Sequence, residues 1–322
     1  SFLEESVTVF GKSCRIAPTK QGFLFAFDRV TGKSLWPIVE RPVPQSDVPG
    51  EETSKTQPFP SRPAPFAAQG FSVADLIDFT PAVKQAAVDE LAKYRTGPLY
   101  APPSLQGTVA MPGVIGGAGW GGAAVDPTTG WAFIKATNSP ALFTLQKRDA
   151  TSDTVDTPYM VDLAHSTLGL SQLNNAEGAG RTTLPINKPP YGTLTAIDLN
   201  TGDHAWMVPN GQAPQYVRDN PRLKGIDLSG LDNPERAPLL VTKTLLFSGD
   251  GAGLFSSGPN GGGPKFRALD KKTGKTLFEM ELPGNETGLP ATYLAGGRQY
   301  VVVAVGTRGN PSELVALSIP RP

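Results

Sequence analysis

The stretch that decides the fold reads Ala26-Phe27-Asp28-Arg29-Val30-Thr31-Gly32, and the chain repeats it. Close copies occupy residues 196–202 and 268–274, and a looser copy occupies residues 124–130. An aromatic residue follows the glycine of each close copy by four positions; these residues are Trp36, Trp206 and Phe278. Such an internal repeat indicates a chain built from copies of one supersecondary unit.

Each copy predicts a tight β-hairpin. The Asp side chain can accept hydrogen bonds from the turn, and Thr-Gly supplies the turn itself because glycine adopts positive φ without strain. β-branched and aromatic residues follow, which favours a second strand, and the aromatic is placed to pack between neighbouring sheets. Recurring hairpins of this kind indicate an all-β fold, a β-propeller of four-stranded blades. The alternative is a β-sandwich in which the turns recur by coincidence.

The spacing of the copies leaves the number of blades open. Their aspartates lie at Asp28, Asp126, Asp198 and Asp270, so the intervals are 98, 72 and 72 residues. A four-stranded blade takes roughly 40–50 residues. Each interval therefore holds one blade with an insertion, or nearly two blades with one degenerate turn. A propeller of the larger kind needs more chain than the 322 residues present.

The composition fits a turn-rich β protein and excludes several functions. Gly and Pro number 36 and 32, while charged residues make up only 18%. Lys plus Arg balance Asp plus Glu at 29 each, which argues against a nucleic-acid surface. The single cysteine, Cys14, excludes an intrachain disulfide and covalent c-type haem, and it is expected to be buried. Because the chain begins at Ser1 without a Met, we expect it to be a processed or cut product.

Two segments interrupt the repeats. Residues 37–103 form a predicted Pro-rich insertion, extended at first and then helical near residues 81–95, where Thr80 is the N-cap and Pro81 occupies the first turn. This insertion either walls a binding site or covers a blade edge, and the sequence leaves both open. Residues 139–190 carry little pattern and are predicted to be a second long loop.

Several stretches outside the repeat resemble one enzyme family. Residues 18–29, 41–51, 116–127 and 299–306 are similar, in order along the chain, to the pyrroloquinoline-quinone (PQQ) dependent dehydrogenases of the glucose and quinate dehydrogenase branch. The resemblance implies an eight-bladed quinoprotein propeller with PQQ on its axis. This chain, residues 1–322, resembles the C-terminal half only and would form a partial propeller.

The resemblance also implies an activity. Enzymes of this family oxidise an alcohol, sugar or cyclic polyol: an Asp base removes the hydroxyl proton, hydride passes to the quinone, and calcium polarises the quinone carbonyl. In the family, the Asp base and the calcium ligands precede the stretch that matches residues 18–29. We therefore expect the calcium ligands outside this chain, and no metal ligand is predicted within it.

The same resemblance implies partners and a location. The expected partners are a small alcohol or sugar, a quinone or cytochrome electron acceptor, and an N-terminal half or second copy that completes the propeller. The expected location is periplasmic or secreted. Two other hypotheses remain: a non-catalytic truncated propeller that serves as a binding or assembly scaffold, and a small self-contained propeller that binds another ligand.

The resemblance implies a catalytic and cofactor-binding role for Lys20. The family places a Lys or Arg at this position, where it donates to the quinone oxygens, and a cation suits oxygens that gain negative charge on reduction. On the residues alone, a surface lysine is the favoured interpretation of Lys20, and only the resemblance makes it a cofactor ligand.

Three further cofactor-binding residues follow from the resemblance. Gly119 stands where the family commonly has an Asn that contacts the cofactor, so that side-chain hydrogen bond is absent here. Trp120 follows it and is interpreted either as a packing residue or as a cofactor contact. Arg236 falls in a loop that the family turns toward the axis, and a solvated loop arginine is the alternative.

Overall fold

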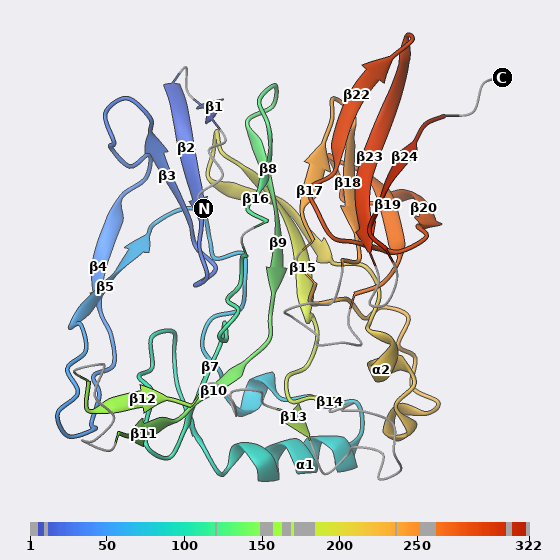
Figure 1. Ribbon diagram of the computed structural model, residues 1–322. Coiled ribbons are helices and arrows are strands. Elements are labelled where there is room, and N and C mark those ends of the chain that lie inside the picture. Colours follow the sequence, from blue (N-terminus) through green and yellow to red (C-terminus); the bar gives the residue numbers. More distant parts are fainter. Residues whose placement is uncertain are drawn as a thin grey trace.

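The computed structural model describes residues 6–9, 12–119, 121–148, 157–162, 169–170, 184–235, 237–251, 262–306 and 311–319. Four β-sheets stand side by side in chain order, and the helices lie with the short strands at one end of them (Figure 1). This end carries the two insertions, and the candidate site lies on it.

The second and third sheets each contain four antiparallel strands in sequence order. The second sheet comprises β8 (Ala124–Asp126), β9 (Trp131–Thr137), β15 (Gly192–Asp198) and β16 (Asp203–Pro209). The third sheet comprises β17 (Leu239–Val241), β18 (Leu245–Gly249), β19 (Lys265–Asp270) and β20 (Thr276–Glu281). A meander of four strands is the unit expected of a propeller blade.

The first and fourth sheets have the same character. The first comprises β1 (Ser6–Val9), β2 (Lys12–Pro18) and β3 (Leu24–Asp28), and a bridge from Phe27 to Ser34 extends it. In the fourth, β23 (Arg298–Gly306) pairs on one side with β21 (Asn285–Glu286) and β22 (Ala291–Ala295) and also pairs with β24 (Glu313–Leu317).

The remaining elements belong to the insertions and connections. The first insertion holds β4 (Ile38–Pro42), β5 (Thr56–Pro60), η1 (Val73–Asp75), α1 (Pro81–Leu91), β6 (Arg95–Thr96) and, beyond residue 103, β7 (Thr108–Ala110). The second holds β10 (Ala141–Phe143), β11 (Leu145–Lys147), β12 (Tyr159–Val161), β13 (Gly169–Leu170) and β14 (Leu184–Pro185). Between the second and third sheets lie α2 (Gln215–Arg218) and η3 (Pro221–Leu223).

The repeated motif, Ala-x-Asp-x-x-Thr-Gly, forms the predicted turn. Asp28 Oδ1 accepts from the amides of Val30 and Thr31 at 2.9 and 3.0 Å, and Asp270 Oδ1 accepts from its own turn in the same way. The three close copies follow the third strands β3, β15 and β19, whereas the looser copy joins β8 to β9. The interval from Asp198 to Asp270 is therefore one blade, which resolves the question that spacing left open for that interval.

The aromatics of the repeat pack between sheets, as predicted, for two of three copies. A Cβ atom placed on Gly202 would lie 2.9 Å from the Trp36 ring, and one on Gly274 would lie 2.9 Å from the Trp206 ring. Trp206 also donates from Nε1 to the Lys271 carbonyl at 3.1 Å. Each ring thus needs the bare glycine of the following sheet's turn. Phe278, on the third sheet, is 61% exposed.

Replacing Trp206 with Ala is expected to lower the free energy of unfolding by about 3 kcal/mol, because both the packing on Gly274 and a hydrogen bond are lost. Urea-induced unfolding of the full-length protein measures the change. The exposed Phe278→Ala serves as the control and is expected to change stability by less than about 0.5 kcal/mol. Equal losses in the two variants would contradict the packing role of Trp206.

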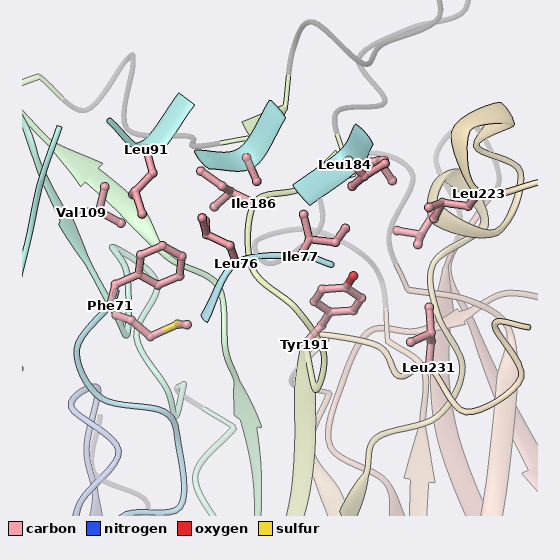
Figure 2. Packing of buried hydrophobic residues seen from close by; sticks show 14 of the residues in the cluster. Phe71, Leu76, Ile77, Leu91, Val109, Leu184, Ile186, Tyr191, Leu223 and Leu231 are labelled. Atoms are coloured by element: carbon pink, nitrogen blue, oxygen red, sulfur yellow. The ribbon is translucent and has the colours of Figure 1, made fainter. Parts of the chain in front are cut away.

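Apolar cores lie between successive sheets. One joins the first sheet to the second, the next joins the second to the third, and the last joins the third to the fourth. Cys14 is fully buried in the first of these cores, as expected. A separate core lies beneath the insertions, where the buried face of α1 meets Leu76 and Ile77 (Figure 2).

Helix α1 begins as predicted but ends earlier. Thr80 Oγ1 accepts from the Val83 amide at 3.2 Å, and Pro81 starts the helix. The helix ends at Leu91 rather than near residue 95, because Arg95 pairs with β7 and its amide donates to the Gly107 carbonyl at 2.9 Å. A partner from a later part of the chain therefore sets the C-terminal boundary.

Two segments predicted as loops contain strands. Within the Pro-rich stretch, β4 and β5 form an antiparallel ribbon, and in the described part of residues 139–190 there are five short strands, of which β10 pairs with β7. Proline is tolerated in the ribbon because a two-stranded ribbon leaves alternate backbone positions without a ladder partner. The short strands escaped prediction because their partners are distant in sequence.

Candidate functional site

The candidate site lies at the end of the sheets opposite the Asp-Thr-Gly turns. Strands alternate in direction within a meander, so the turn after each second strand and the segment before each first strand meet at the same end. The turn between β2 and β3 carries Lys20, and the segment before β8 carries the glycine-rich residues 116–122. Topology alone therefore brings these two predicted stretches to the same end.

Lys20 lies on a closed turn. The Thr19 amide donates to the Phe23 carbonyl at 2.8 Å, the Gly22 amide donates to the Thr19 carbonyl at 3.0 Å, and Gly22 takes φ of +83°. The Lys20 side chain is exposed, and its Nζ donates to the Val114 carbonyl at 3.3 Å. One long hydrogen bond leaves the ammonium with capacity for a further acceptor.

The glycine-rich segment packs directly on this turn. The Gly117 amide donates to the Lys20 carbonyl at 2.7 Å, and a Cβ on Gly116 would lie 2.5 Å from Lys20 Cβ. A Cβ on Gly117 would lie 2.7 Å from Ala67 Cβ. These glycines are needed for close approach to the neighbouring sheet. Their contacts bring the turn that carries Lys20 and the segment that leads to Gly119 together, and the role of these residues in cofactor binding stays a prediction.

A recess opens beside this segment, between the second and third sheets. Its lining residues come from the glycine-rich segment, from β8 and β9, and from β17 with the two residues before it: Gly119, Gly121, Gly122, Ala124, Lys135, Ala237, Pro238 and Leu239. Trp120 and Arg236 lie outside the described residues, so their contacts stay predictions. The residues on both sides of Trp120 line the recess, and so does Ala237, which follows Arg236.

Sequence reasoning missed the charged residues next to the recess. Lys135 is only 4% exposed, and its Nζ donates to the Gly249 carbonyl at 2.5 Å. Arg267, on β19, is also buried; it pairs with Asp250 and, at 2.7 Å, with Glu279. A lysine within the apolar run of β9 was the available signal, because lysine is almost never buried without partners.

Burial shifts the protonation of two of these groups. Burial lowers the pKa of Lys135, although the carboxylate of Glu286 and those nearby act in the opposite direction. Burial raises the pKa of Glu286 to about 7, and the Lys135 ammonium partly offsets this. Both carboxylate oxygens of Glu286 lack a hydrogen-bond partner among the described residues. Over the same part of the chain, no three His, Cys, Asp or Glu side chains gather into a metal-binding group.

A family model described as "PQQ: Glucose/ethanol/alcohol dehydrogenase, beta-propeller domain" matches residues 11–301. The chain belongs to this PQQ dehydrogenase propeller family. The match, together with the four-stranded antiparallel sheets, confirms both the family predicted from the sequence and the β-propeller fold.

Relatives of this PQQ-family chain carry dehydrogenase names. The quinate/shikimate dehydrogenase (quinone) of Acinetobacter baylyi is 29% identical over 92% of this chain and 36% of its own length. A probable quinate dehydrogenase of Xanthomonas campestris pv. juglandis is 30% identical, with 94% and 38% covered. The quinoprotein glucose dehydrogenase of Gluconobacter oxydans is 30% identical, with 90% and 36% covered. The chain thus spans little more than a third of these relatives.

Solved structures give a similar comparison. The quinohemoprotein alcohol dehydrogenase of Comamonas testosteroni is 20% identical, with a TM-score of 0.49 over 94% of this chain and 33% of that one. A europium-containing methanol dehydrogenase is 19% identical, with a TM-score of 0.48 over 95% and 39%.

Proposed function

We propose that this chain supplies one wall of the cofactor site of a PQQ-dependent dehydrogenase that oxidises an alcohol, sugar or cyclic polyol by hydride transfer to the quinone. The observation that carries the proposal is the placement of Lys20, whose ammonium is presented at one end of the sheets by the turn that Gly116 and Gly117 hold. The relatives' names, quinate/shikimate and glucose dehydrogenase, support a cyclic polyol or a sugar as substrate.

The residues present fit one side of a planar, anionic quinone. PQQ bears carboxylates and two adjacent carbonyl oxygens, so it needs cationic and N–H donors. Lys20 is an exposed cation with one long hydrogen bond among the described residues, and Gly119 and Gly121 of the neighbouring glycine-rich segment add no side chain to the recess that they line. The donor chemistry therefore suits the group.

In this site, Lys20 would orient the quinone and stabilise the negative charge that develops on its oxygens. When bound, PQQ supplies a hydride acceptor whose oxygens gain negative charge on reduction. The Lys20 ammonium would donate to one of these oxygens and stabilise the charge as it develops. The Val114 carbonyl limits the freedom of the ammonium, and the Gly117 amide fixes the turn that carries it. Gly119 offers no side-chain donor, so Lys20 carries more of this task.

We place the general base and the calcium ligands outside the residues of this chain. The general base and calcium ligands would come from a further segment or a second copy, which would also cover the fourth sheet, where Tyr293, Leu294 and Leu314 are 43%, 76% and 76% exposed. We propose a quinone or cytochrome as electron acceptor and a periplasmic or secreted location. Within the described ranges, no helix has the length and apolarity needed to span a bilayer.

The proposal is tested with the full-length protein, PQQ and calcium. Reduction of an artificial electron-acceptor dye is measured with quinate, glucose and simple alcohols as substrates. Turnover that requires PQQ supports the proposal, and no turnover with any of them rejects it.

A non-catalytic scaffold is the second candidate, because Gly119 lacks the donor that the family commonly places there. Equilibrium binding of PQQ separates the two functions without turnover. A scaffold is supported if neither the wild type nor Lys20→Ala binds PQQ, whereas tighter binding by the wild type supports the enzyme.

A further inference from the structure

Lys135 links the recess to a buried group of charges. Its side chain leaves β9 of the second sheet, lines the recess with Gly119, Gly121 and Gly122, and ends at the Gly249 carbonyl of the third sheet. The proposed function assigns it no task. A buried ammonium that lines a recess feels any charge that enters there, because little water screens the interaction.

Glu286 of the fourth sheet also packs against Gly249. It is 2% exposed, and a Cβ on Gly249 would lie 2.0 Å from its Oε2 atom. Gly249 therefore neighbours both groups: its carbonyl accepts from Lys135, and its lack of a side chain makes room for the Glu286 carboxylate. Neither oxygen of that carboxylate accepts a well-formed hydrogen bond among the described residues, although the Gly249 backbone amide is close enough to lower its pKa. Burying an ionised carboxylate without full partners is costly.

The charges around this pair come from three other positions. Glu235, before β17, and Asp250, after β18, place carboxylates near Lys135, and Arg267 of β19 adds a guanidinium. Asp250 is held by Arg267 in a buried ion pair. Acidic groups therefore outnumber basic ones around Lys135, and binding one proton removes the excess negative charge at little cost.

We propose that Lys135 and Glu286 form a buried proton-accepting site that takes up a proton from solvent when a polyanionic quinone binds beside Gly119. An O–H bond forms on the Glu286 carboxylate, the buffer gives up the proton, and no bond to the ligand is made. Negative charge in the recess favours the protonated pair through the low-dielectric interior. The ligand's identity rests on the proposed function.

The pKa of Glu286 also supports the proposed proton uptake. Because burial raises the pKa of Glu286 to about 7, its proton exchanges near neutral pH rather than in acid. Binding of the quinone would raise this pKa further, so proton uptake is expected to be greatest slightly above neutral pH, where the free protein's Glu286 is mostly ionised.

The first measurement uses the full-length protein without cofactor. Infrared difference spectra across pH 5–9 follow the carboxyl band of buried protonated Glu. We expect a band that titrates in the wild type and in Glu281→Gln, an exposed control on β20, and that is lost in Glu286→Gln. A wild type without this titration overturns the proton-accepting site. Lys135→Met with Glu286→Gln removes both charges at once and guards against misfolding from one unpaired charge.

The second measurement follows the binding of PQQ. Calorimetry in two buffers of different ionisation enthalpy gives the number of protons taken up, and the Kd is expected to rise by up to about tenfold per pH unit above neutral. Glu286→Gln is expected to abolish the uptake and flatten this slope. PQQ binding with the same proton uptake in both proteins overturns the inference and leaves the proposed function intact. No binding by the wild type overturns the proposed function and the coupling, and the infrared titration still decides the proton site.

Discussion

Replacing Lys20 with Ala in the full-length protein is expected to lower kcat with PQQ by about 10²–10³-fold, the usual loss when one donor to a developing oxyanion is removed. The turn itself is held by backbone hydrogen bonds from Thr19, Gly22 and Gly117, so the variant keeps its fold. The effect therefore reports the missing ammonium. Steady-state dye reduction measures it, and thermal unfolding verifies that stability is unchanged.

Two further variants serve as controls for the test of Lys20. Lys20→Arg keeps the cation and several N–H donors, so it is expected to recover part of the activity. Lys33→Ala removes an exposed lysine of the first Asp-Thr-Gly turn, at the opposite end of the same sheet, and is expected to leave kcat unchanged. If Lys20→Ala turned over as fast as Lys33→Ala, Lys20 would be a surface lysine and the proposed site would be wrong.

Replacing Asp126 with Asn is expected to lower the free energy of unfolding by about 3 kcal/mol, because it leaves the Lys271 ammonium buried without its counter-charge. The side chains of Lys271 and Asp126 are 7% and 4% exposed, and their ion pair joins the second sheet to the turn of the third. Lys271 also donates to the Thr242 carbonyl at 3.2 Å, which keeps the loss from being larger. Urea-induced unfolding at neutral pH measures the change.

The control and the pH dependence distinguish this pair from a surface one. Asp203→Asn breaks an ion pair with Arg62 whose side chains are 64% and 52% exposed, and it is expected to cost less than about 0.5 kcal/mol. Burial alone raises the pKa of Asp126, but hydrogen bonds from Lys271 and Thr129 outweigh it and hold the pKa below the ordinary value.

The sign of the pH effect follows from this lowered pKa. The ionised Asp126 stabilises the fold above the unfolded pKa of about 3.9, and this contribution is lost as the pH falls through the lower folded pKa. The difference between wild type and Asp126→Asn should therefore shrink in acid. A difference that stays constant from neutral pH to pH 3 would show that the charge of Asp126 is not the cause.

The turns and the packing aromatics could be predicted because their physics is local. An Asp three residues before Thr-Gly closes the turn because its side chain accepts hydrogen bonds from the amides of that same turn. Trp36 and Trp206 each follow the glycine of the turn by four positions, and this spacing fixes the face of the next strand on which the ring lies. The partner of each ring, Gly202 or Gly274, belongs to the same repeated phrase one sheet further on, so the repeat contained both halves of the contact.

The pairing of the insertions could not be predicted, because it depends on distant partners. Helix α1 ends at Leu91 since Arg95 pairs with β7. Strand β10 forms because β7 offers it a free edge, whereas β11 pairs with β12 and β13 pairs with β14. The hydrophobic periodicity of these stretches does not indicate which strands they pair with. The identity of the family came from resemblance over nearly the whole chain, not from these elements.

By itself, the sequence determined the repeat, the hairpins and the family, because turn chemistry and a recurring phrase act within a few residues. Only the tertiary structure placed Lys20 on the glycine-rich segment and brought Lys135 and Glu286, 151 positions apart, next to the same residue, Gly249. The physical reason is that burial and charge depend on every element packed around a group. That set of neighbours exists only once the sheets stand beside one another.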